Sequence, residues 1–160
     1  MKKLLSLILA LALTLTAAVA CAESITVVSR EAGSGTRSAF EEIVGLLAKD
    51  ENGNEVTLVD ESRALIADST NAVSTTVAGK ANSIGYISLG SYDETLVHAI
   101  DVDEVACSQE NVLGGTYAIA RPFVLVAGPG TEQIANAFLD YVMSAEGQAV
   151  IAENKYIPVK

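Results

Sequence analysis

The stretch Ser29-Arg-Glu-Ala-Gly-Ser-Gly-Thr-Arg37 decides the fold of this chain. It follows the β-branched run Ile25–Val28, which predicts a strand over residues 25–29. Four apolar residues after it have the spacing of one helix face: Phe40, Ile43, Val44 and Leu47. The order is therefore strand, glycine-rich turn and helix, with the helix predicted over residues 36–49. Because the first turn of a helix has unpaired backbone N–H groups, this order predicts a site for an anion.

The side chains of this stretch allow two interpretations. The glycines let the backbone approach a ligand closely, and the hydroxyls of Ser34 and Thr36 can cap the helix or donate to an anion. Arg30 and Arg37 lie beside the positive end of the helix dipole, where a cation is unfavourable by about 0.3–1 kcal/mol. Two cations at that end favour an anion between them. The alternative is an ordinary turn with a helix cap.

The N-terminus has the pattern of a secretory signal peptide, which we assign to residues 1–22. A basic pair, Lys2-Lys3, precedes the apolar run Leu4–Val19, and Ala18-Val19-Ala20 is a small-x-small cleavage pattern. The apolar run is shorter than the ~20 residues that span a bilayer. We therefore expect an exported protein, located in the periplasm or at the outer face of the cell membrane.

The two cysteines leave the question of a lipid anchor open. Cys21 stands directly after the cleavage pattern, where a bacterial lipoprotein carries its lipidated cysteine. Ala18 lies three residues earlier, where leucine is usual in such proteins, so ordinary cleavage after Ala20 or Ala22 is the alternative. Cys107 is interpreted as a small strand residue, and a disulfide between the two cysteines is compatible with export.

Length and charge limit the kind of protein. The 160 residues suggest one domain. The formal net charge is −10, and loss of Lys2 and Lys3 with the signal peptide leaves −12. Such an acidic protein is a poor candidate for binding nucleic acid or anionic lipid. An anion site in it has to act through local hydrogen bonds, against the overall field.

Strand and helix patterns alternate through the rest of the chain, which predicts the α/β class. Strands or extended segments are expected at 56–59, 84–88, 97–102 with 104–107 as a hairpin, 116–127 and 156–159. Helices are expected at 72–78, 131–143 and 144–153, the first capped within Ser69-Thr70-Asn71 and the second by Thr131. Residues 61–68 fit either a loop or a short helix. Gly85 inside its strand predicts the close approach of another backbone.

The sequence shows no arrangement for catalysis or metal binding. Ser34 lacks the G-x-S-x-G pattern, and the single histidine, His98, falls on the surface of the predicted hairpin. The loop lacks the lysine of a P-loop, and no His or Cys spacing fits zinc. After the Asx-rich run 50–54, Glu55 stands where an EF-hand calcium loop needs glycine. We therefore expect neither an enzyme nor a bound metal or cofactor.

Taken together, the motifs resemble those of the phosphate-binding proteins of phosphate ABC transporters. The resemblance begins with residues 29–37 and continues in order through most of the chain. Its further motifs are Ser69–Val73, Ser83–Gly90, Asn111-Val112, Gly115–Tyr117, Arg121–Phe123, Ser144–Gln148 and Tyr156–Pro158. The resemblance implies a type II periplasmic-binding-protein fold, in which two α/β lobes hold phosphate in a cleft without chemistry.

The resemblance also implies a set of phosphate contacts. Arg30 is expected to pair with the oxyanion. The loop residues expected to donate N–H or hydroxyl groups are Gly33, Ser34, Gly35 and Thr36. Possible secondary contacts are Glu31, Arg37, Ser69 and Thr70. Some family members have an aspartate two residues after the arginine, which accepts a proton from hydrogen phosphate and so rejects sulfate; this chain has Ala32 there and Glu31 one position earlier.

The chain also differs from the family in length. Family members begin with an N-terminal lobe that supplies the other half of the phosphate cage, whereas here the signal peptide leads almost directly into the motif of the second lobe. We interpret residues 23–117 as a ligand-binding lobe and residues 118–160 as a return segment of an incomplete first lobe. The expected function is phosphate binding for ABC-transporter uptake, with permease subunits and a separate N-terminal lobe or a dimer mate as partners. The alternative is an exported interaction or sensory module that has lost tight ligand binding.

Overall fold

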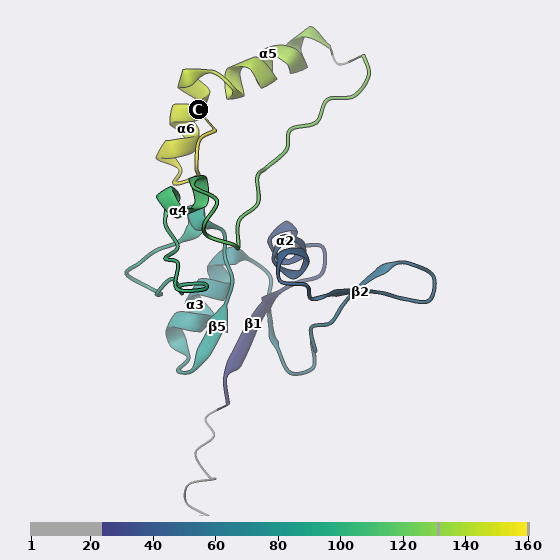
Figure 1. Cartoon of the computed structure of the whole chain (residues 1–160), viewed down its shortest axis with the longest axis vertical. Helices are drawn as coiled ribbons and strands as arrows, with labels where there is room; N and C mark the ends of the chain where they lie inside the picture. Colours follow the sequence, from purple (N-terminus) through teal and green to yellow (C-terminus); the bar gives the residue numbers. More distant parts are fainter. Residues whose placement is uncertain (1–23, 131, 160) are drawn as a thin grey trace, which may run out of the picture.

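The computed structural model describes residues 24–130 and 132–159. The predicted signal peptide, the candidate lipidation site at Cys21 and the predicted cap Thr131 lie outside these residues. The elements in chain order are β1 (Thr26–Arg30), α2 (Gly35–Ile43), β2 (Leu47–Lys49), β3 (Glu55–Thr57), β4 (Leu65–Ala67), α3 (Thr70–Gly79), β5 (Ser83–Gly85), the 3-10 turn η1 (Leu89–Ser91), α4 (Gln109–Leu113), α5 (Gln133–Val142) and α6 (Ala145–Glu153). Strands and helices alternate through much of the chain, which confirms the α/β class (Figure 1).

A three-stranded parallel sheet in the order β4-β1-β5 organises the N-terminal half. β1 is central, with Val28 opposite Leu65 of β4 and Gly85 of β5. The carboxyl ends of parallel strands meet at one edge of a sheet, so the segments that follow Arg30, Ala67 and Gly85 share that edge. β4 falls within residues 61–68, where the sequence predicted a loop or short helix. The strand was not predicted because these residues are extended through their pairing with β1, which the local sequence does not show.

The core of this unit is small. It consists of Val28, Ala67 and Val73, flanked by the partly buried Ala72, Val77 and Ile87. Gly85 is required there, since a Cβ at this position would lie 2.7 Å from Cγ1 of Val73 and 3.1 Å from the backbone oxygen of Val28. The predicted close approach at Gly85 is confirmed: the backbone of β1 and a side chain of α3 both lie close to this residue.

The helix predicted over residues 36–49 is wrong in its second half. α2 ends at Ile43, and Gly45 adopts φ +72°, a left-handed conformation that ends a helix at little cost for glycine. Leu47 then enters β2, which pairs antiparallel with β3. The carboxylate of Asp50 closes the predicted turn, accepting N–H bonds from Asn52 and Asn54 at 2.8 Å each.

The extended structure predicted beyond residue 96 is largely wrong. Of the hairpin at 97–107, the structure contains one bridge, Val102 to Val105, around a turn in which Asp103 and Glu104 have positive φ. Residues 116–127 and 156–159 form no strand among the described residues. Alternating sequence favours an extended chain, but a strand also needs a paired neighbour, and these residues pair with no strand in the described part of the chain.

The two predicted C-terminal helices are confirmed as α5 and α6. α5 begins after Glu132, and α6 is capped by the Ser144 hydroxyl, which accepts from the Gly147 N–H at 3.2 Å. Figure 1 shows both helices at one end of the molecule, joined to the rest by the long segment before them. Tyr156 then packs against Gly90 of η1. Across the described residues, none of the helices has the length and apolar character needed to cross a membrane.

Candidate anion-binding site

The glycine-rich loop joins β1 to α2 at the carboxyl edge of the sheet. Gly33 takes φ +86°, which makes the turn, and Ser34 is the N-cap of α2, its hydroxyl accepting from the Arg37 N–H at 3.3 Å. The N–H groups of Gly35 and Thr36 have no acceptor among the described residues. The loop therefore presents the unpaired donors that the sequence predicted at the start of the helix.

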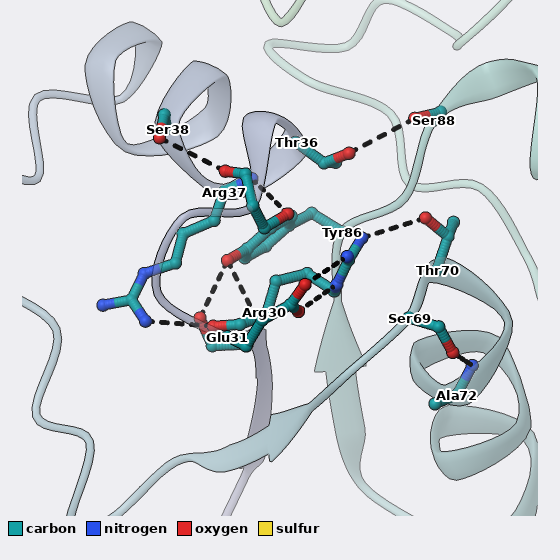
Figure 2. Close-up of polar contacts among 12 residues, drawn as sticks. Arg30, Glu31, Thr36, Arg37, Ser38, Ser69, Thr70, Ala72, Tyr86 and Ser88 are labelled. Atoms are coloured by element: carbon teal, nitrogen blue, oxygen red, sulfur yellow. Dashed lines mark hydrogen bonds and ion pairs between the residues drawn. The ribbon is translucent and has the colours of Figure 1, made fainter.

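Arg30 brings a cation to this loop from the last position of β1. Its residue surface is only 9% exposed, and Nη1 donates to Oγ1 of Thr70 at 3.0 Å. Nε and Nη2 donate to the two carboxylate oxygens of Glu31 at 2.7 and 2.8 Å. The structure thus brings together Arg30, Glu31 and Thr70, three of the residues predicted for the site (Figure 2).

The Arg30–Glu31 pair changes the acid–base properties of both groups. The hydrogen bonding of Arg30 to the Glu31 carboxylate is the main cause that raises the pKa of Arg30, against an opposing contribution from burial. The same bond lowers the pKa of Glu31 below its ordinary value. Both side chains are therefore charged at neutral pH.

Tyr86 fixes the start of the loop, a role that the sequence did not predict. Its hydroxyl accepts from the backbone N–H of Arg30 at 3.1 Å and lies 2.8 Å from the Ser29 hydroxyl. Its ring stacks on Phe40 of α2, with centroids 4.2 Å apart. The signal was its position, because Tyr86 directly follows β5 and so falls at the carboxyl edge that also carries Arg30.

Arg37 occupies a different place from the one expected of an anion contact. Its side chain is buried and donates to Glu41 at 2.7 Å, to Glu61 at 2.6 Å and to the backbone oxygen of Arg30 at 3.0 Å. Burial acts to lower the pKa of Arg37, but the hydrogen bonds with Glu61 and Glu41 outweigh it and raise that pKa. In Figure 2 the guanidinium of Arg37 points away from that of Arg30. These contacts make Arg37 a support of the loop, and Glu61 is a second supporting residue that the sequence did not indicate.

The start of α3 forms the other side of the candidate site. Ser69 caps this helix, its hydroxyl accepting from the Ala72 N–H at 3.2 Å, as the capping interpretation predicts. Thr70 is directed to Arg30 instead. Nearby, the hydroxyl oxygens of Thr36 and Ser88 lie 3.5 Å apart. Thus Thr70 contacts the Arg30 guanidinium, while the Thr36 and Ser88 hydroxyls face each other beside the start of α2 (Figure 2).

The chemistry available at this site is recognition by hydrogen bonds and charge. Among the described residues, no group of His, Cys, Asp or Glu side chains could hold a metal ion. His98 lies exposed on the segment after η1. The arrangement instead offers one guanidinium, free backbone N–H donors and hydroxyls, the groups that bind a small oxyanion.

Comparison with known proteins shows the family of this chain. A family model described as a PBP superfamily domain matches residues 15–146. This chain belongs to the PBP superfamily. It is 42% identical over 137 residues to the phosphate-binding protein PstS 2 of Streptococcus pneumoniae, covering 86% of this chain and 46% of the relative. The corresponding protein of Streptococcus agalactiae is 39% identical, with 85% and 46% covered. The chain thus spans about half the length of the curated relatives it matches.

Solved structures in this superfamily have the same fold. A phosphate-binding protein of a phosphate ABC transporter from Streptococcus pneumoniae matches with a TM-score of 0.76 and 42% identity, covering 85% of this chain and 52% of that chain. A substrate-binding protein from Clostridium perfringens, solved with bound phosphate, matches with a TM-score of 0.69 and 39% identity, covering 86% and 53%. These findings confirm the resemblance to the binding proteins of phosphate ABC transporters and the type II periplasmic-binding-protein fold.

Proposed function

We propose that this chain binds inorganic phosphate for uptake by an ABC transporter. The observation that carries the proposal is the pair of N–H groups at the start of α2, Gly35 and Thr36, which have no acceptor among the described residues and belong to the same loop that begins at the nearly buried Arg30. Relatives named as phosphate-binding proteins support phosphate as the oxyanion. No observation favours the alternative of an interaction module without tight ligand binding.

In this proposal phosphate lies at the start of α2 and is held without covalent chemistry. Arg30 supplies the positive charge, and the loop residues Gly33, Ser34, Gly35 and Thr36 supply N–H and hydroxyl donors. The helix dipole adds a favourable contribution of about 0.3–1 kcal/mol for an anion at this end. Donors that are already fixed in place lose little conformational entropy on binding, which favours affinity.

The division at residue 118 belongs to the same proposal. Residues 23–117 form the ligand-binding lobe, and residues 118–160 pack with a complementary lobe, which is either a separate N-terminal lobe or a dimer mate. The exposure of Phe123 and Val126, 87% and 86%, supports this division, because contiguous apolar side chains in water mark an interaction surface. The mature protein acts outside the cytoplasmic membrane, where it delivers phosphate to the permease subunits.

Isothermal titration calorimetry with inorganic phosphate tests the proposal. Wild-type protein is titrated alone and with a complementary N-terminal lobe. Arg30→Ala is expected to weaken phosphate binding at least tenfold, because the substitution removes a charge-assisted hydrogen bond to the anion. Arg63→Ala is the matched control, because Arg63 is an exposed arginine in the turn before β4. Absence of phosphate binding by the wild type in both settings contradicts the proposal.

A further inference from the structure

Glu31 occupies the two donors of Arg30 that best fit an oxyanion. The Nε and Nη2 groups of a guanidinium form a planar fork, and the Glu31 oxygens accept from both at 2.7 and 2.8 Å. Two oxygens of a phosphate or sulfate would use the same parallel N–H bonds. A carboxylate of the chain itself therefore holds the position that the ligand needs.

The two partners of this ion pair are anchored very differently. The Arg30 side chain is 11% exposed, and Thr70 and Tyr86 hold its tip and its backbone N–H. The Glu31 side chain is 38% exposed, and Arg30 is its one hydrogen-bonded side-chain partner among the described residues. Glu31 can rotate into water, where its carboxylate is fully solvated, while Arg30 stays in place.

We propose that Glu31 is an internal competitor that pairs with Arg30 in the anion-free protein and that an incoming oxyanion displaces it. The inference rests on the proposed function, because it concerns the same site. It has two consequences: the nearly buried guanidinium is never left without a counter-ion, and every oxyanion binds more weakly than it would to a free Arg30. The effect is common to phosphate and sulfate, since both exchange with the same carboxylate.

The charged groups around the Arg30–Glu31 pair determine which substitution serves as the control for Glu31→Gln. Arg37 also attracts Glu31, while the Asp68 carboxylate attracts Arg30 through space. Asp68 is exposed, follows β4 and makes no hydrogen bond with Arg30. Asp68→Asn therefore removes one negative charge near the guanidinium without removing the competitor, and Glu31→Gln removes the competing charge with little change in shape.

Calorimetry with inorganic phosphate and, separately, with sulfate tests the inference. Glu31→Gln is expected to tighten the binding of both anions by a similar factor, on the order of 3–10-fold for a partly exposed ion pair. Asp68→Asn is expected to change either affinity by less than about twofold. Equal effects of the two substitutions overturn the inference. A loss of phosphate binding in Glu31→Gln with sulfate unaffected also overturns it, and makes Glu31 the acceptor of the phosphate proton instead.

Carbon-13 NMR of the Glu31 carboxyl group separates this inference from the proposed function. In the anion-free protein, Arg30→Gln should raise the pKa of Glu31, which shows that the pair exists whether or not phosphate binds. In wild-type protein, saturating phosphate should also raise the pKa of Glu31, because the displaced carboxylate loses its contact with Arg30. A pKa of Glu31 that stays low in the presence of phosphate means that Glu31 remains paired with Arg30, and this result overturns the inference. If neither wild type nor Glu31→Gln binds phosphate, the proposed function fails; wild-type binding that Glu31→Gln leaves unchanged overturns the inference alone.

Discussion

The N-terminal unit, residues 24–91, and the C-terminal segment, residues 118–159, bury their apolar residues to very different degrees. In the first, Val28 and Val73 are almost fully buried between a parallel sheet and α3. In the second, Phe123 is 87% exposed and Ile134 on α5 is 81% exposed. The candidate site lies entirely in the unit that has its own core. Local geometry at the site can therefore form without the C-terminal segment, whereas that segment needs further contacts to bury its apolar face.

Two arginine–glutamate pairs give the largest expected contrast. Arg37 and Glu41 form a buried pair at 2.7 Å inside the N-terminal unit, while Arg121 and Glu42 form an exposed pair at 2.6 Å that links the two regions. Arg37→Ala leaves Glu41 buried without its partner and should lower the free energy of unfolding by about 3–5 kcal/mol. Arg121→Ala should lower it by less than about 1 kcal/mol. Urea denaturation measures both, and similar losses would show that the first pair is not desolvated as described.

The same valine-to-alanine change should have different effects in the two regions. Val28 is 0% exposed and Val126 is 86% exposed. Val28→Ala should cost about 2 kcal/mol through lost burial and the cavity left behind, and Val126→Ala less than about 0.5 kcal/mol. Thermal and urea unfolding of the two variants check this. A large loss for Val126→Ala would mean that the C-terminal segment is packed in solution.

A smaller effect is expected from pH. Arg30 lowers the pKa of Glu31, so the pair stabilises the fold above the ordinary carboxyl pKa and loses this contribution as pH falls through the lowered value. Wild type should be more stable than Glu31→Gln at pH 7, and the difference should shrink below about pH 4. The midpoint of urea unfolding, followed from pH 7 to pH 3 for both proteins, measures the difference. A gap that stays constant across this range would contradict the pairing.

The elements that the sequence predicted well are those whose signals are local. The strand–loop–helix order around Arg30 follows from β-branched residues, glycines and helix spacing, and α3 follows from its cap at Ser69. The helix end at Gly45 was missed, because apolar spacing continues to Leu47 and only the positive φ of Gly45 stops the helix. β4 was missed because three residues become a strand only by pairing with β1.

The residues of the candidate site also divide into those that local sequence predicts and those that only the tertiary structure brings together. An anion site in the stretch from Arg30 to Thr36 was predicted from neighbouring residues, and the role of each residue in it from the family resemblance. Tyr86 and Glu61 were not, because they reach Arg30 and Arg37 from more than 20 positions away in the chain. The fork contact between Arg30 and Glu31 joins neighbouring residues, yet the sequence does not show that two adjacent side chains fold back on each other. Contacts set by tertiary structure and by side-chain conformation thus account for most of what the sequence left out.

The most direct test of the phosphate site is a two-dimensional amide NMR titration of the protein with inorganic phosphate. The N–H groups of Gly35 and Thr36, which lack an acceptor among the described residues, should show the largest shifts, together with the Nε–H of Arg30. The amides of α5 should shift little. Shifts that saturate at Gly33 to Thr36 and vanish in Arg30→Ala are the predicted result; saturating shifts elsewhere with these amides unmoved would contradict the account.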